Sequence, residues 1–140
     1  MLEEYKKFIG HWAYRSLRNE TDIQKDFNDL EFGRGIITIE SIGEDFIAKA
    51  NLDMGGGYVL NLKGELVRQN NEIASIRVKG EGIEGTLTAG WRYDYEGFII
   101  PQWPTGVDQA FVISGSTIRV TDHGTARAGY VGTFYMVRIP

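Results

Sequence analysis

The chain has 140 residues, no cysteine and a formal net charge of -4 at pH 7. A chain of this length can bury a core without disulfides or metals, so we expect one domain over residues 1–140, and the lack of cysteine excludes thiol catalysis and cysteine-ligated zinc. Because the basic residues are scattered singly along an acidic chain, we expect no nucleic-acid partner.

The N-terminal segment predicts a short helix or turn ahead of the first strand. Helical spacing relates four of its apolar residues: Leu2, Tyr5, Phe8 and Ile9. The first ten residues, MLEEYKKFIG, carry acidic side chains and no long apolar run. Secretory signals and membrane spans both need such a run, so the sequence predicts a cytoplasmic protein with no membrane partner.

The first strand is expected over residues 11–18, where side chains alternate between two faces. If Arg15 points to water, Trp12 and Tyr14 point to the interior. The following residues, 19–31, are polar, with isolated apolar residues at spacings of four and three. This segment is either a surface loop or a short lid-like helix.

Eighteen glycines punctuate the chain at short intervals, which is typical of tight turns between short strands. Further strands are predicted at 32–40, 45–52, 57–65, 72–80, 83–95, 98–100, 107–113, 116–121 and 129–139. The links between them are short, among them a turn at Ser114-Gly115, so neighbouring strands should be antiparallel.

A meander of this kind must protect its edge strands, and closure is the simplest solution. The sequence therefore predicts an all-β fold, an antiparallel up-and-down (meander) β-barrel of about eight strands with a short N-terminal helical turn. A two-sheet sandwich is the main alternative, but it needs longer crossing connections than this chain offers.

Gly10-His11-Trp12 and Arg138 stand near the two ends of the chain. The first resembles the G-x-W of the calycins, the superfamily of lipocalins, avidins and fatty-acid-binding proteins, and the second stands where lipocalins place an arginine against that tryptophan. Thr121-Asp122-His123 is similar to the T-D-Y of a late lipocalin turn. The resemblance implies a lipocalin-like or streptavidin-like barrel with paired first and last strands, a cation–π contact between Trp12 and Arg138, and binding of a small apolar molecule.

Residues 87–109 are the part of the chain best suited to a pocket wall. They include Trp91, Tyr93 and Trp103, whose ring faces supply apolar contact while their polar tips orient a ligand. Prolines flank Trp103, which favours a pocket rim there; the alternatives are a cap over exposed core and a subunit contact, as in a homodimer. Gln109 lies on the same face of its predicted strand as nearby apolar residues, so its amide is expected to point inward.

Two faces alternate along strand 83–95, one aromatic and one charged. The aromatic face holds Trp91, Tyr93 and Tyr95, and the charged face holds Arg92, Asp94 and Glu96. We favour an inward aromatic face and an outer charged row that pairs with Arg77 and Lys79. An inward Arg–Asp pair would be costly unless it held a polar ligand, and it would indicate an enzyme.

The chain offers few groups for catalysis. Of its two histidines, His11 is expected on the outer face, and His123 follows Asp122 in a turn that needs no further explanation. If the strands close around His123, it becomes a candidate proton shuttle. Arg119 is expected to point outward. Because hydrolase, zinc and nucleotide motifs are absent, we assign no catalytic residue and expect neither a metal nor a cofactor.

Three functions follow from these observations. The first is binding of a small, mainly apolar or aromatic molecule inside the barrel, through Trp12, Tyr14, Trp91, Tyr93, Trp103, Gln109 and Arg119. The second is a small-barrel enzyme, of the isomerase or cyclase type, that acts on a hydrophobic substrate through Arg92, Asp94, Arg119 or His123. The third is a filled barrel with a protein-interaction role on its surface.

Overall fold

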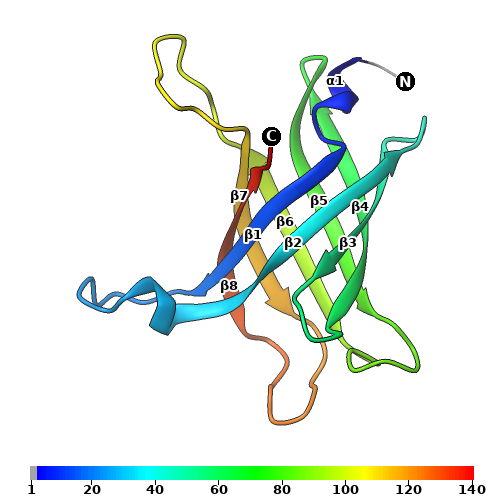
Figure 1. The fold of residues 1–140 in the computed structure, drawn as a ribbon, viewed down its shortest axis with the longest axis vertical. Helices are drawn as coiled ribbons and strands as arrows, with labels where there is room; N and C mark the ends of the chain where they lie inside the picture. Colours follow the sequence, from blue (N-terminus) through cyan, green and yellow to red (C-terminus); the bar gives the residue numbers. More distant parts are fainter. Residues whose placement is uncertain (1–2) are drawn as a thin grey trace.

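The computed structural model describes residues 3–140, and in it eight antiparallel strands close into one barrel in the order β1 to β8 (Figure 1). The strands are β1 (Gly10–Arg18), β2 (Glu31–Ile42), β3 (Ile47–Asp53), β4 (Val59–Gln69), β5 (Glu72–Gly82), β6 (Arg92–Ile99), β7 (Val112–Arg119) and β8 (Val131–Arg138). The predicted meander barrel is confirmed, and the two-sheet sandwich is excluded. A short helix, α1 (Glu3–Lys6), precedes β1, while Leu2 of the predicted turn lies outside the described residues.

The barrel closes between its first and last strands. β1 pairs with β8 from Trp12 opposite Arg138 to Arg18 opposite Gly132. The expected cation–π contact is wrong, because no such contact joins Trp12 and Arg138 within residues 3–140. The guanidinium of Arg138 instead donates to the carbonyl oxygens of Ile9 (2.7 Å), His11 (3.3 Å) and Ile139. Arg138 therefore ties the chain ends together through backbone carbonyls.

Side chains alternate between the interior and the solvent along the strands, with interruptions at register shifts in β2 and between β4 and β5, and the inward set forms the core together with Tyr5 and Phe8. Its fully buried members are large, among them Trp12, Phe8, Phe134, Leu52 and Leu60. The indole Nε1 of Trp12 donates to the carbonyl of Phe8 at 2.9 Å, so the ring is satisfied as well as buried. Trp12 thus anchors the core beneath α1.

Glycine has a different role in β7 from the one expected. Ser114-Gly115 is not a turn but lies inside β7, where Gly115 stands opposite Gly97 of β6. A Cβ on Gly115 would lie 1.9 Å from the carbonyl oxygen of Glu96, and one on Gly97 would lie 2.9 Å from the Phe134 ring. These glycines are therefore required by close packing rather than by a turn.

The boundaries of β6 also differ from the prediction. Residues 83–91, expected as strand, form a loop that folds back on β5, because a Cβ on Gly82 would lie 1.6 Å from the carbonyl oxygen of Thr88. Residues 100–111 form the long connection from β6 to β7: the loop predicted at 101–106 is confirmed, but residue 100 and residues 107–111, expected as strand, belong to the connection as well.

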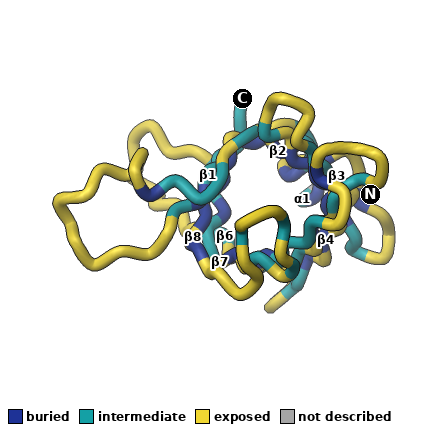
Figure 2. The backbone as a smooth tube through the Cα atoms, turned by 90° about the horizontal axis from the view of Figure 1, so that it is seen from below, coloured by how far each residue is buried: buried dark blue, intermediate teal, exposed yellow. Residues whose placement is uncertain are grey.

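The two ends of the barrel are built differently (Figure 1). At one end, here called the closed end, lie α1, the C-terminus and the connection 100–111, and Tyr5 and Phe8 fill the barrel beneath α1. At the other, the open end, lie the connections 19–30, 54–58, 83–91 and 120–130. Figure 2 views the open end and shows these loops mostly exposed around the more buried strands.

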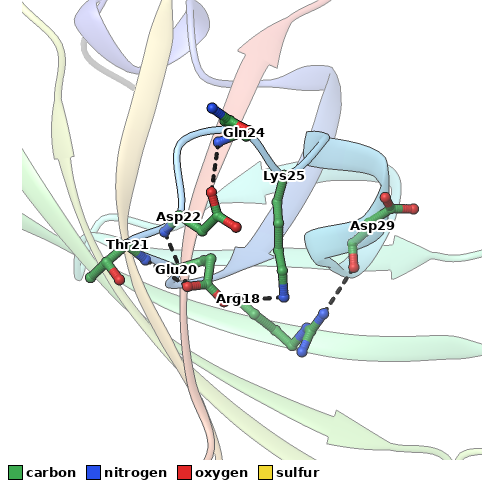
Figure 3. Close-up of polar contacts among 7 residues, drawn as sticks. All are labelled: Arg18, Glu20, Thr21, Asp22, Gln24, Lys25 and Asp29. Carbon is green, nitrogen blue, oxygen red and sulfur yellow. Dashed lines mark hydrogen bonds and ion pairs between the residues drawn. The ribbon is translucent and has the colours of Figure 1, made fainter.

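The connection 19–30 is a surface loop that ends in a short 3-10 helix, η1 (Phe27–Leu30). Its own polar groups hold it (Figure 3): Glu20 accepts the backbone N–H groups of Thr21 (2.9 Å) and Asp22 (3.1 Å), and Arg18 donates to the carbonyl of Asp29 at 2.9 Å. Of the two structures predicted for this segment, the loop is the closer description.

Among residues 3–140, no helix is both long enough and apolar enough to cross a membrane.

Candidate functional site

The interior of the barrel contains two cavities of different character. The inner one is apolar and encloses only about 50 Å³, with Tyr14, Tyr95 and Phe134 among its walls. The open-end cavity encloses about 210 Å³. It is lined by Tyr14, Ser16, Phe32, Gly33, Leu52, Met54, Leu60, Trp91, Tyr93, Tyr95, Arg119 and His123. The open-end cavity is the candidate functional site.

Trp91 is placed in this cavity by the loop 83–91. The buried hydroxyl of Thr88 donates to the carbonyl of Val59 at 2.7 Å, which fastens the loop to β4, and accepts the N–H of Ile83 at 3.1 Å, which closes the loop on itself. Gly82 then donates to the Trp91 carbonyl at 2.8 Å. Because the backbone is held on both sides, the indole enters the cavity in a fixed direction.

His123 is placed by the connection 120–130. Its backbone exchanges two hydrogen bonds of 2.9 Å with Ala126, around Gly124 in a left-handed conformation (φ 57°). Asp122 accepts the N–H of Ala128 at 2.6 Å, and Thr121 donates to the carbonyl of Gly90 at 2.9 Å. The turn is therefore braced internally and tied to the loop that carries Trp91.

A hydrogen-bonded chain joins Arg119, Tyr93 and His123. The Nε of Arg119 donates to the Tyr93 hydroxyl at 2.8 Å, and that hydroxyl lies 2.6 Å from Nε2 of His123. Arginine is only a donor, so the Tyr93 oxygen accepts from it and its proton is available to an unprotonated Nε2. Both hydrogen bonds of this series are therefore satisfied when the imidazole of His123 is neutral and carries its proton on Nδ1.

The surroundings of His123 favour that neutral form. Partial burial, followed by the positive charge of Arg119, lowers the pKa of His123 below its ordinary value of 6.5. Trp91 stacks on the imidazole, with ring centroids 3.8 Å apart and an interplanar angle of 17°. His123 is therefore a neutral, oriented group at pH 7.

Buried hydroxyl groups form the floor of the cavity. Burial raises the pKa of Tyr14 to about 12, against the opposing effect of the Ser16 hydroxyl, and burial raises the pKa of Tyr95 well above its ordinary range. Both phenols are neutral at pH 7. Beside Tyr95 in the sheet stands Thr117, whose buried Oγ1 has no hydrogen-bond partner among residues 3–140.

Four of the predicted ligand-binding residues line the open-end cavity: Tyr14, Trp91, Tyr93 and Arg119. The interpretation of Arg119 as an outward group is wrong, because it follows Ile113 and Thr117 on the inward face of β7. The favoured aromatic face of β6 is confirmed as the inward one. On the outer face Arg92 pairs with Asp94 at 2.7 Å and Arg77 with Glu96 at 3.3 Å.

Three of the predicted residues do not reach this cavity. Trp12 is completely buried in the core below the closed end. Trp103 is 73% exposed on the connection 100–111, and the amide of Gln109 is exposed and bonds the backbone N–H and carbonyl of Trp103, each at 2.6 Å. The predicted rim of Trp103 above Trp91 and Tyr93 is wrong, because β6 carries the chain from one end of the barrel to the other.

The sequence interpretation named His123 only as a conditional catalytic group and not as a ligand-binding residue, and it missed Phe32 and Met54 as cavity residues. A signal for His123 was available: in a meander the start of β6 lies beside the end of β7, so Trp91 and Tyr93 must adjoin Arg119 and the turn after it. Phe32 and Met54 had no such signal, because each lies at a strand end. Among the described residues, no group of His, Asp or Glu could hold a metal ion.

These features define a class: a closed, eight-stranded antiparallel meander barrel with an aromatic cavity, lined by arginine and histidine, at one end. In comparisons with known proteins, the chain matches no family model, no curated protein and no solved structure. The functional argument therefore rests on the cavity itself.

Proposed function

We propose that the protein binds a small molecule containing one aromatic or similarly planar ring in its open-end cavity. The observation that carries this proposal is the composition of the walls, which join the aromatic rings of Phe32, Trp91 and Tyr93 to polar groups of Arg119 and His123. Mostly apolar walls with a few convergent polar groups are typical of small-molecule sites. On this proposal the closed meander barrel is a calycin-like binding protein.

The size of the ligand follows from the two cavity volumes. The inner cavity, at about 50 Å³, is too small for a ring. An apolar cavity of about 150 Å³ holds benzene. The open-end cavity, at about 210 Å³, therefore has room for one ring with a substituent. The ligand sits at the mouth of the barrel, above a filled core, and not in a deep cup.

A titration of ¹⁵N-labelled protein with benzamide, a neutral single-ring probe, tests this proposal. We expect saturable shifts of the Trp91 indole N–H and of backbone amides in 91–93 and 119–123. The Trp12 indole, completely buried in the core, should not move. Trp91→Ala should weaken binding at least about tenfold, since a stacked aromatic contact and its buried area are lost.

Trp103→Ala is the matched control, because it removes the same side chain from the connection at the closed end. It should bind benzamide as the unaltered protein does. Absence of any saturable shift, or shifts confined to residues 100–111, would refute binding at the open end.

A second candidate function is acid–base catalysis, and the chain from Arg119 through Tyr93 to His123 favours it. The Tyr93 oxygen can take a proton from a bound substrate as its own proton passes to Nε2 of the neutral His123, while the guanidinium of Arg119 stabilises the oxyanion that forms. The reaction class would be proton transfer within one ring-sized substrate, as in an isomerase. Ketonisation of enol-phenylpyruvate, followed by its ultraviolet absorbance, is a direct assay. A rate equal to that in buffer would leave binding as the function.

A further inference from the structure

Arg119 differs from the arginines that pair elsewhere on the barrel. Four others form ion pairs, namely Arg34 with Glu31, Arg68 with Glu4, Arg77 with Glu96 and Arg92 with Asp94. Within residues 3–140, no ion pair includes Arg119. The carboxylate of Asp122, nearby in sequence, instead accepts a hydrogen bond from the N–H of Ala128. The guanidinium charge is thus left without a counter-ion in a chain whose net charge is -4.

Neutral groups hold this guanidinium in place. Besides Tyr93, its Nη1 donates to the carbonyl of Arg127 at 3.1 Å. Three rings surround the Cζ atom, with centroids at 5.0 Å for Phe32, 5.7 Å for Tyr93 and 5.6 Å for Tyr130. Ring faces and carbonyls orient an arginine without neutralising it. The positive charge therefore remains directed at the cavity that Arg119 lines.

The other lining residues supply no opposite charge. No Asp or Glu is among the described residues that line the open-end cavity, and the phenols of Tyr14 and Tyr95 are neutral at pH 7. The imidazole of His123 is neutral as well. The guanidinium of Arg119 would repel a cationic ligand, whereas an anion would find a planar donor already oriented.

We infer that the ring-sized ligand carries an anionic oxygen group, a carboxylate in the simplest case, which accepts hydrogen bonds from Arg119. This inference rests on the proposed binding function and adds the chemical class of the ligand. The planar fork of a guanidinium matches the two oxygens of a carboxylate, and charge-assisted hydrogen bonds of this kind are among the stronger ones in proteins. The ring then lies against Trp91 and Phe32.

Three isosteric probes test the inference: benzoate, benzamide and benzamidine, which share one ring and differ in charge. Titrations at pH 7.5 and constant ionic strength, followed by the Trp91 indole N–H, should give a Kd for benzoate at least about tenfold below that for benzamide, with benzamidine weakest. Equal affinities of benzoate and benzamide would overturn the inference and leave the proposed function intact. Failure of all three to bind would refute the proposed function itself.

Substitution of Arg119 tests whether this residue causes the preference for benzoate over benzamide. Arg119→Met should abolish the advantage of benzoate over benzamide while benzamide still binds, and Arg77→Met, which alters an exposed arginine of the outer face, should preserve it. A benzoate preference that survives in folded Arg119→Met protein would overturn the assignment to this residue. If Arg119→Met does not fold, the order of the three probes on the unaltered protein still decides the inference.

Discussion

Trp91 lies flat against the imidazole of His123, with ring centroids 3.8 Å apart and planes 17° apart. The two residues come from different loops, 83–91 and 120–130, which the hydrogen bond from Thr121 to Gly90 joins. The stack therefore joins these two loops of the open end in one wall of the cavity.

Removal of this stack should raise the pKa of His123. Trp91 covers one face of the imidazole, and partial burial is the leading cause of its lowered pKa. In Trp91→Ala protein the pKa should move up toward the ordinary value of 6.5, because water then solvates the imidazolium. Titration of the His123 Cε1–H signal by NMR measures this change. The same pKa in Trp103→Ala and in the unaltered protein provides the control, and an unchanged value in Trp91→Ala would contradict the role of burial.

His123 should also make folding stability depend on pH. Its pKa is lower in the folded state than in the unfolded chain, so near that pKa the unfolded chain binds more protons. The free energy of unfolding should therefore fall as pH drops below about 6.5 and level off below the folded-state pKa. Urea melts between pH 5 and pH 8 test this. The difference in free energy of unfolding between the unaltered protein and His123→Gln should shrink as the pH falls across that window, whereas Trp103→Ala, which leaves His123 in place, should keep the pH dependence of the unaltered protein.

The closed end depends on Trp12 and Arg138 in different ways. Trp12→Ala should lower the free energy of unfolding by about 3–5 kcal/mol, since a completely buried aromatic ring leaves a cavity. Arg138→Met should cost about 2 kcal/mol, because carbonyls of Ile9, His11 and Ile139 lose a charged donor. Urea melts give both values. Arg77→Met, at an exposed ion pair, should cost less than about 1 kcal/mol, and a loss for Arg138→Met no larger than this would contradict its role.

Two inward glycines should respond differently to alanine. A Cβ on Gly115 would lie 1.9 Å from the Glu96 carbonyl oxygen, so backbone must move, and Gly115→Ala should cost more than about 2 kcal/mol. A Cβ on Gly64 would lie 3.3 Å from a methyl group of Val78, which can shift, so Gly64→Ala should cost less than about 1 kcal/mol. Thermal melts of the two variants compare their losses of stability. A smaller loss for Gly115→Ala would show that β6 and β7 are not in close contact at this point.

Gln109 should control the mobility of the connection 100–111. Its amide makes both hydrogen bonds to the Trp103 backbone. Gln109→Ala should lower the ¹⁵N heteronuclear NOE of Trp103 and its neighbours without changing those of β6 or β7, because the lost bonds are internal to the loop. Gln102→Ala, which removes one bond to the carbonyl of Ala110, should have a smaller effect.

The sequence by itself determined the barrel. Alternation of apolar and polar residues fixes which face of a strand is buried, and short links make neighbouring strands antiparallel, so closure follows from local pattern. The same local signal predicted Trp12 and Tyr14 as inward residues and the aromatic face of β6, because period-two alternation survives wherever the strand itself is correctly recognised.

The tertiary structure alone decided which residues meet at the site. Trp103 is closer to Tyr93 in sequence than His123 is, yet the seven residues of extended strand from Tyr93 to Ile99 span about 20 Å and carry Trp103 to the opposite end. Arg119 and His123 return to the open end along β7. The local sequence around Gly115 predicts a turn, and only the close approach of the β6 backbone shows that Gly115 lies within a strand. Contacts between strands, not patterns within one, placed Arg119, Tyr93 and His123 in a single hydrogen-bonded chain.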